Sequence, residues 1–329
     1  MRIRPRQQLL EIWRATSRTS IRGGQWEWGG RDSGNSISDA EQLLCLLSPA
    51  TDVPAFRLDR PDQTAEDILE ALRDLGDSTA IPRLLVKALT DYMRRYTDES
   101  GTPIFSGGSY FTSTDPERPP GEEQLRLDVV NSFSVSVSLT LATIGFVRVF
   151  RTVVARADIL AELATLEQMA STRLSAAIIG LLRSFAIFVF DADSADGRLL
   201  GRMVNQRGLP QRRVVEDLRE ALREIRAGLR DVTVDVPNIE DLDNSNRLFA
   251  CGWSWGITNK APAVETEENV GKQRDGVALA APYLYFTVLA LDGIEDLFSE
   301  RTRVLGLLND EQARLARLLQ SRWDLTQSY

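Results

Sequence analysis

Three acidic residues near the C-terminal end have a spacing that suits a bound metal ion. Asp292, Glu295 and Asp296 stand at positions i, i+3 and i+4, which places them on one face of a helix. Carboxylate oxygens are the ligands that Mg²⁺ takes in proteins, often together with substrate phosphates. The spacing therefore suits a magnesium site, and it is also that of a polar stripe near a helix end.

The absence of histidine limits every other kind of chemistry. None of the 329 residues is histidine, the side chain whose unperturbed pKa lies near neutrality. Ser-His-Asp and Cys-His nucleophilic pairs, imidazole acid–base catalysis and histidine metal sites are therefore excluded. Neither a P-loop nor a dinucleotide-binding glycine motif occurs. We expect no cofactor, and we expect bound magnesium only if the acidic cluster is a metal site.

Tryptophan is concentrated in two glycine-containing loops. Four of the six tryptophans are Trp26 and Trp28 in the first loop, and Trp253 and Trp255 in the second. A tryptophan ring can form the wall of a ligand site, because its face packs on apolar, sugar or cationic groups. It can equally cover the end of a hydrophobic core. These four residues are our ligand-binding candidates.

The composition is that of a globular protein with an acidic surface. The formal net charge is -8, a sign that disfavours nucleic acid as a partner. The basic residues are 36 arginines and three lysines, which is typical of the codon usage of a GC-rich genome. Cys45 and Cys251 show neither metal-site nor disulfide spacing, and residues 1–18 indicate an amphipathic helix rather than a signal peptide. We therefore expect a cytoplasmic protein.

Helical signals dominate the chain and favour a mostly α fold with little β structure. Apolar residues recur with helical spacing after Ser38, which forms an N-terminal capping box with Glu41. We expect this helix to end at Pro49. Asn309 and Gln312 mark the start of the last helix in the same way.

Three stretches almost without charge are expected in the interior. Residues 129–147 and 277–291 contain no charged residue, and residues 174–190 contain only Arg183. Helices that are apolar on all sides lie in the core of a large protein or in a membrane. The serines in 129–147 favour a buried helix over a membrane span. Its partial alternation leaves a strand as an alternative, and a peripheral membrane contact stays open.

The predicted elements fit one helical domain over residues 1–329. A soft boundary is expected near 191–208, and residues 231–274 are expected to form a long loop region. Loops longer than about 15 residues are usually functional or disordered. Any binding rim is therefore expected there.

Aromatic and glycine-rich loops precede several of these helices. Residues 26–30 (WEWGG) come before the helix at Ser38, and residues 105–111 (FSGGSYF) come before the uncharged stretch at 129. This unit resembles the helix-pair repeat of α/α toroids, such as the terpene-cyclase and prenyltransferase-like barrels. The resemblance implies a toroid-like double ring of helices, and a plain helical bundle explains the same pattern.

The resemblance also implies candidate catalytic residues. Residues 240–244 (EDLDN) are similar to the DxDD motif of class II terpene cyclases, which makes Asp243 the candidate proton donor. The acidic cluster at 292–296 is similar to the magnesium-binding cluster of class I isoprenoid enzymes. Some glycosidases with paired carboxylates are also α/α barrels. Three aspartates stand at loop-to-helix junctions that would line the mouth of such a barrel: Asp32, Asp39 and Asp128.

Three functions follow from these patterns. We expect a non-catalytic scaffold or adaptor that binds a protein partner or itself, because the chain has no histidine, no cofactor motif and no complete acid motif. The alternatives are a histidine-free cyclase or lyase for an isoprenoid-like substrate and a carbohydrate-active α/α barrel walled by the four tryptophans. A closed cavity lined by tryptophan and aspartate favours an enzyme, whereas a filled core with an exposed apolar patch favours a scaffold.

Overall fold

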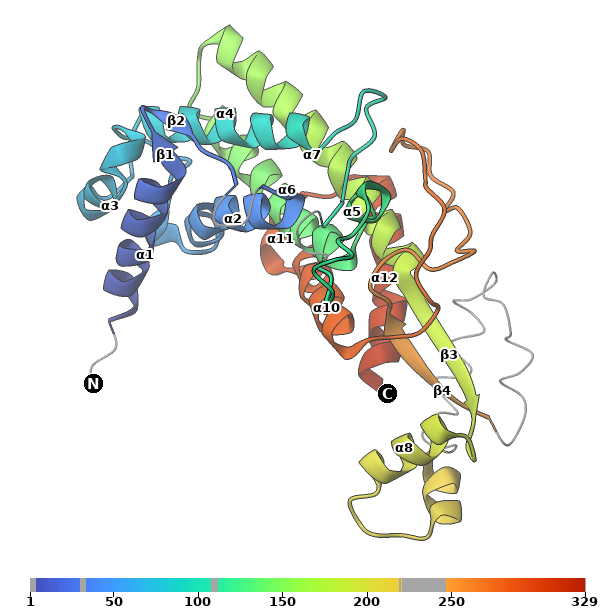
Figure 1. Ribbon diagram of the computed structural model, residues 1–329. Coiled ribbons are helices and arrows are strands. Elements are labelled where there is room, and N and C mark those ends of the chain that lie inside the picture. The colour runs from blue at the N-terminus through green and yellow to red at the C-terminus, as the bar shows by residue number, and fades with distance from the viewer. Residues whose placement is uncertain (1–3, 30–33, 108–111, 219, 221–246, 329) are drawn as a thin grey trace.

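The computed structural model describes residues 4–29, 34–107, 112–218, 220 and 247–328 (Figure 1). Most of these residues are helical, and the named strands form two separate two-stranded sheets, which confirms a mostly α fold. The helices and strands in chain order are α1 (Pro5–Ser20), β1 (Ile21–Arg22), β2 (Gln25–Trp26), α2 (Ser36–Asp52), α3 (Glu66–Ala71), α4 (Ala80–Arg95), α5 (Glu122–Leu125), α6 (Val130–Arg151), α7 (Ala157–Ser184), β3 (Phe185–Asp191), α8 (Ala195–Val204), β4 (Arg247–Trp253), α10 (Leu284–Phe298), α11 (Glu300–Val304) and α12 (Asp310–Ser328).

Helix α6 lies at the centre of the molecule and packs against α2, α7 and α10. It contains most of the uncharged stretch 129–147 and is long and apolar enough to cross a bilayer, yet 78% of its most apolar window is buried within the protein. The expectation of a buried helix is confirmed, and the strand alternative is wrong. Arg148 and Arg151 in its last turn both bind Glu167 of α7, at 2.9 and 2.5 Å, where cations also favour the negative end of the helix dipole.

The space around α6 is filled by packed side chains. Helix α7 runs beside α6, and α4 and α12 cover other parts of α7. Phe133 and Val137 of α6 and Leu174 and Ile178 of α7 are at most 1% exposed, within one hydrophobic cluster that extends from α1 to α12. Buried apolar area of this extent is the main stabilising contribution to such a fold. The toroid-like arrangement stays a prediction.

Strands β3 and β4 lie in segments for which the sequence predicts a helix and a loop. Residues 174–190 were expected to form one buried helix, but α7 ends at Ser184 and β3 begins at Phe185. β3 pairs antiparallel with β4, from Phe185 opposite Trp253 to Asp191 opposite Arg247. β4 itself lies within residues 231–274, for which a long loop is predicted. A short apolar run rich in aromatic and β-branched residues fits a strand as well as a buried helix, and pairing with β4 decides between them.

A second, smaller core lies at the end of the β3–β4 sheet that carries Asp191 and Arg247, the end beside which α8 lies in Figure 1. Phe190 and Ala192 pack there with Leu248 and Phe249, and Leu200 of α8 packs against this cluster. Helix α8 lies within residues 191–208, where the sequence predicts a soft boundary. The single-domain organisation with that boundary stays a prediction.

The capping box predicted at the N-terminus of α12 is confirmed, whereas the one predicted for α2 is wrong. Asn309 and Gln312 form the predicted capping box of α12, since each side-chain oxygen accepts the other's backbone N–H, at 2.8 and 3.1 Å. For α2 the predicted capping box of Ser38 with Glu41 is wrong, because the helix begins about one turn earlier. Asn35 is the N-cap and accepts from the Ser38 amide at 3.0 Å, and Pro49 lies inside the helix, which continues to Asp52.

A buried arginine joins three parts of the bundle. Arg173 of α7 is 2% exposed. Its guanidinium donates to the Tyr96 carbonyl at the end of α4, to the Ile104 carbonyl and to the Ser136 hydroxyl of α6, at 3.0, 3.1 and 3.0 Å. It also lies over the rings of Tyr92 and Phe105, with centroid distances of 5.1 and 4.5 Å. Carbonyls, hydroxyls and aromatic faces thus replace the water around this charge.

We predict that Arg173→Met destabilises the protein strongly. The substitution keeps the apolar stem but leaves the Ile104 carbonyl without its donor, whereas the Tyr96 carbonyl still accepts the Ile104 amide at 2.8 Å. An unsatisfied buried group costs about 1–3 kcal/mol, and the charge-assisted bonds of the guanidinium are lost in addition. The free energy of unfolding, measured by urea denaturation, should fall by about 3–5 kcal/mol. The exposed Arg156 at the start of α7 is the matched control, and Arg156→Met should cost less than about 1 kcal/mol. Equal losses in the two variants would contradict the role of Arg173.

Candidate functional site

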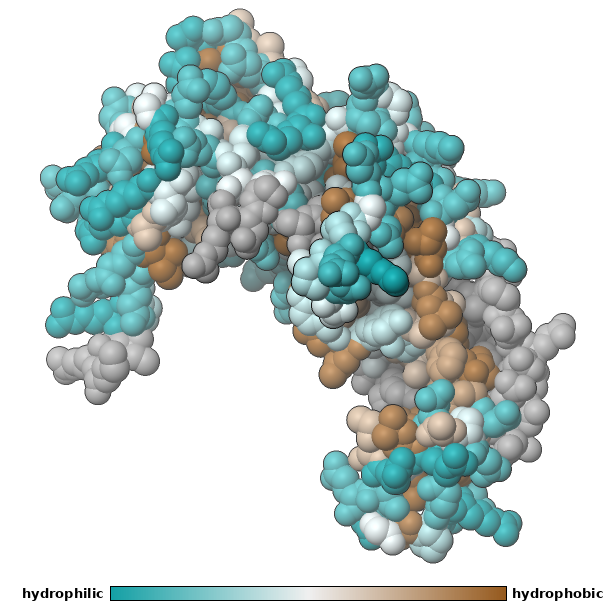
Figure 2. All heavy atoms as spheres, in the orientation of Figure 1, coloured by the Kyte–Doolittle hydropathy of each residue, from teal (hydrophilic) through white to brown (hydrophobic). Residues whose placement is uncertain are grey.

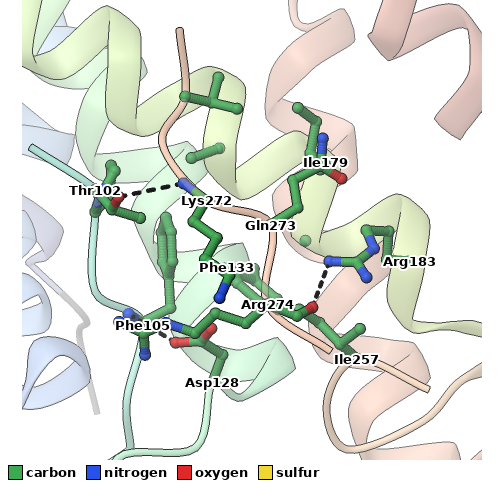
Figure 3. A pocket seen from close by; sticks show the side chains of 14 residues that line it. Thr102, Phe105, Asp128, Phe133, Ile179, Arg183, Ile257, Lys272, Gln273 and Arg274 are labelled. Atoms are coloured by element: carbon green, nitrogen blue, oxygen red, sulfur yellow. Dashed lines mark hydrogen bonds between the residues drawn. The ribbon is translucent and has the colours of Figure 1, made fainter. Parts of the chain in front are cut away.

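Two of the predicted site residues meet in one cleft beside the start of α6. Asp128 precedes α6, Trp255 follows β4, and both line a hollow of about 220 Å³. A smaller hollow of about 40 Å³ adjoins it and shares Asp128, Ile257 and Arg274 (Figure 3). We call the two hollows together the Asp128 cleft. Trp255 is tied to α6 because its carbonyl accepts the Val130 amide at 2.9 Å.

Asp128 is half-buried, and its carboxyl group lies in a cation-rich setting. It accepts the Phe105 amide at 3.1 Å. Burial raises the pKa of Asp128, and the positive charges of Arg274, Arg173 and Arg183 oppose that rise without cancelling it. Asp128 is therefore the predicted catalytic candidate with the clearest site geometry.

The sequence did not reveal the cations of this cleft. Lys272 and Arg274 come from a segment that crosses the cleft, residues 270–277, which we call the strap. Both side chains extend toward Asp128 in Figure 3. The only local signal was the rarity of lysine, with three in the chain.

Trp26 and Trp28 lie near α4 and line neither hollow of the Asp128 cleft. Their rings are 5.7 Å apart, and the Trp28 indole N–H donates to Asp91 of α4 at 2.6 Å. Trp26 lines an open groove of about 1180 Å³ along α4, with Lys87 and Phe150 among its walls. The four tryptophans therefore do not form one carbohydrate site.

Trp253 is a core residue, so the prediction that it walls a ligand site is wrong. It is fully buried, its indole N–H donates to the Leu181 carbonyl at 2.9 Å, and its ring packs edge-on against Phe185 at 5.1 Å. An indole in the interior needs such an acceptor. Trp253 thus joins the β3–β4 sheet to α7.

The acidic cluster of α10 does not converge on a metal site in the described part of the chain. No group of three His, Cys, Asp or Glu side chains there is arranged to hold an ion. Asp292 and Glu295 are exposed, whereas Asp296 is partly buried and its pKa is raised by that burial, against a hydrogen bond from Ser138. The magnesium role of the cluster stays a prediction.

The remaining aspartates fall into two groups. Asp32 and Asp243 lie outside the described residues. Asp39 is fully buried, accepts from the Tyr96 hydroxyl at 2.6 Å and from the Gly29 amide at 3.2 Å, and has a pKa raised by burial. Its contacts hold the loop before α2 against α4.

The N-terminal half of α10 exposes apolar side chains, so the prediction that residues 277–291 are a helix buried on all sides is wrong. Residues 277–283 precede the helix, and only the α10 face with Thr287, Ala290 and Ile294 is buried. Leu284 is 83% exposed. Of the fifteen large apolar side chains exposed in the described chain, six lie within residues 277–288. We call them the α10 surface: Val277, Leu279, Tyr283, Leu284, Tyr285 and Val288.

Exposed acidic residues flank the α10 surface at both ends, and Arg126 and Arg274 lie near Val277. Asp275 precedes the surface, and Asp292 and Glu295 lie one to two turns after Val288 on α10; all three are exposed. Hydrophobic side chains gather beside β3, β4 and α10 in Figure 2. Contiguous exposed apolar residues with a polar rim are typical of interaction sites.

The fold and surfaces define a mostly α protein with a filled core, an open small cleft and an exposed apolar helix face. The family model described as SCO2524-like matches residues 1–329. The chain therefore belongs to the SCO2524-like family. No curated protein and no solved structure matches it.

We predict that Asp128→Asn stabilises the protein increasingly as pH rises. Because burial raises the folded-state pKa of Asp128, the folded protein holds this proton more tightly than the unfolded chain. The wild type should therefore lose stability relative to the variant as pH rises above the unfolded value of about 3.9. Urea midpoints of both proteins at pH 4, 6 and 8 measure the difference. A variant that loses stability relative to the wild type between pH 4 and 8 would contradict the raised pKa.

Proposed function

We propose that the protein is a non-catalytic adaptor that docks a protein partner on the α10 surface. The observation that carries this proposal is the exposure of Leu284 and its neighbours on a helix whose other face is packed in the core. Leaving large apolar side chains in water costs about 25 cal/mol per Å² of apolar area, and docking removes that cost. The filled interior around α6 also speaks for binding at the surface.

The chemistry of the α10 surface favours a protein over a lipid membrane. The acidic residues Asp275, Asp292 and Glu295 would repel the anionic headgroups of a bilayer. Tyr283 and Tyr285 combine apolar rings with polar hydroxyls, as at the centre of many protein interfaces. The partner we propose has an apolar face with basic residues around it. A second copy of this chain would be detected as self-association.

We also propose that the protein acts in a reducing compartment, the cytoplasm. Cys45 and Cys251 are not joined in a disulfide. Burial raises the pKa of Cys251 to about 11, which keeps this thiol protonated and unreactive.

We predict that Leu284→Asp combined with Val288→Asp weakens partner binding strongly without unfolding the protein. Both side chains are exposed, so the free energy of unfolding should change by less than about 1 kcal/mol. Two buried charges at the centre of an interface should weaken binding by at least about tenfold. The measurement is the amount of stoichiometric partner recovered when tagged protein is purified at its native expression level, with multi-angle light scattering to detect self-association.

Val304→Asp on α11 is the matched control, because Val304 is 74% exposed and lies outside the α10 surface. It should keep the partner. The proposal fails if the double variant keeps the partner, or if the wild type is a monomer that brings down none. Binding of the wild-type protein to vesicles of anionic lipid would contradict the proposed protein partner and indicate a membrane surface instead.

A further inference from the structure

The inner part of the Asp128 cleft carries more positive than negative charge. Arg183 lies beneath the strap and donates to the carbonyls of Ala261, Pro262 and Arg274, at 3.1, 3.0 and 2.8 Å. These carbonyls satisfy its hydrogen bonds but do not neutralise its charge. With Lys272 and Arg274, three cations border the smaller hollow, and Asp128 is its one carboxylate.

The ammonium group of Lys272 is available to a ligand. Its side chain is exposed, extends into the cleft and has no ion pair among the described residues (Figure 3). Arg274 has one long ion pair, 3.7 Å from Asp98. Charge-assisted hydrogen bonds from such groups are the strongest that a small anion can receive in a protein.

Apolar walls face these cations. Phe105 and Phe133 border the inner hollow, and Trp255, Ile257 and Leu127 border the outer one. Glu123, Arg126 and Asp275 also line the outer hollow, so the excess of positive charge is confined to the inner one. The volume of the outer hollow, about 220 Å³, is below the range of about 300–1,000 Å³ that is usual for drug-sized ligands. The ligand must therefore be compact, with one apolar side and one charged end.

The strap over the cleft is held rigidly. The Gln273 side chain bonds both backbone groups of Val264, at 2.9 and 2.7 Å. Gly276 passes so close to the Thr258 carbonyl that an added Cβ would lie 2.1 Å from its oxygen. A pre-formed site loses little conformational entropy when it binds.

We propose that the Asp128 cleft binds a small organic anion, with an apolar or aromatic body against Trp255 and Ile257 and a carboxylate or phosphate group at Lys272 and Arg274. The strap carries both cations and ends at Val277, where the α10 surface begins. The site does not depend on the proposed docking function, because its ligand contacts are separate from Leu284 and Val288.

Calorimetric titration with benzoate and phenyl phosphate tests the site, with neutral benzamide and cationic benzylamine as counterparts of the same size. We expect at least one anion to bind at least about tenfold more tightly than both counterparts, since hydrogen bonds to charged groups are the stronger ones. The preferred anion distinguishes a carboxylate site from a phosphate site. Lys272→Gln and Arg274→Gln should each weaken its binding about tenfold.

The sign of the charge effect separates this site from a cation site around Asp128. Asp128→Asn keeps the acceptor for Phe105 and removes a negative charge, so anion binding should be unchanged or tighter. Lys87→Gln, an exposed lysine on α4, is the control and should bind like the wild type with an unchanged melting temperature. Equal binding of benzoate, phenyl phosphate and benzamide, preference for benzylamine, loss of binding in Asp128→Asn, or no saturable binding would each overturn the proposal.

Discussion

The guanidinium of Arg173 lies where α4, α6 and α7 meet, and its hydrogen bonds determine how these helices are joined. A cation in the interior is tolerated only with full hydrogen bonding, because desolvation of a charge costs several kcal/mol. Tyr96, Ile104 and Ser136 supply acceptors from three different segments. The segment that carries Ile104 continues to Phe105, whose amide binds Asp128. The position of Asp128, and hence of the cleft, therefore depends on this one buried charge.

Because the core around α6 is filled by packed side chains, a ligand or partner must bind at the surface of the protein. α6 is surrounded by α2, α7 and α10, so ligand contact is restricted to the ends and outer faces of the bundle. The chain from Trp253 to Tyr283 forms much of that outer region. Backbone hydrogen bonds anchor it at both ends, from Ser254 to Ser184 and from Tyr283 to Trp253, both at 2.9 Å. One anchored segment thus contributes to both the Asp128 cleft and the α10 surface.

Local sequence signals predicted the elements that depend on local interactions. The mostly α fold, the burial of residues 129–147 and the cap at Asn309 follow from hydrophobic periodicity and side-chain capping, which need no distant partner. β3 was missed because its identity depends on pairing with β4, about sixty residues later. The all-round burial predicted for 277–291 was wrong, because an uncharged run does not show which of its faces has a packing partner.

The candidate site was predictable only in part, for the same reason. Asp128 and Trp255 were identified from their positions in loops, and the fold places both in one cleft. Lys272 and Arg274 were missed because the strap is positioned by the carbonyl contacts of Arg183, which no local pattern reveals. Trp253 has the same loop context as Trp255, and only burial distinguishes the core residue from the site residue.

Hydroxyl-radical footprinting of the free protein and of its complex with the co-purified partner tests the central claim most directly. The account predicts that Leu284 and Tyr285 are labelled strongly in the free protein and lose that labelling in the complex. Met203 of α8 and Val304 of α11, which are also largely exposed, should be labelled equally in both states. Unchanged labelling of Leu284 and Tyr285 in a complex that protects another surface would contradict the account.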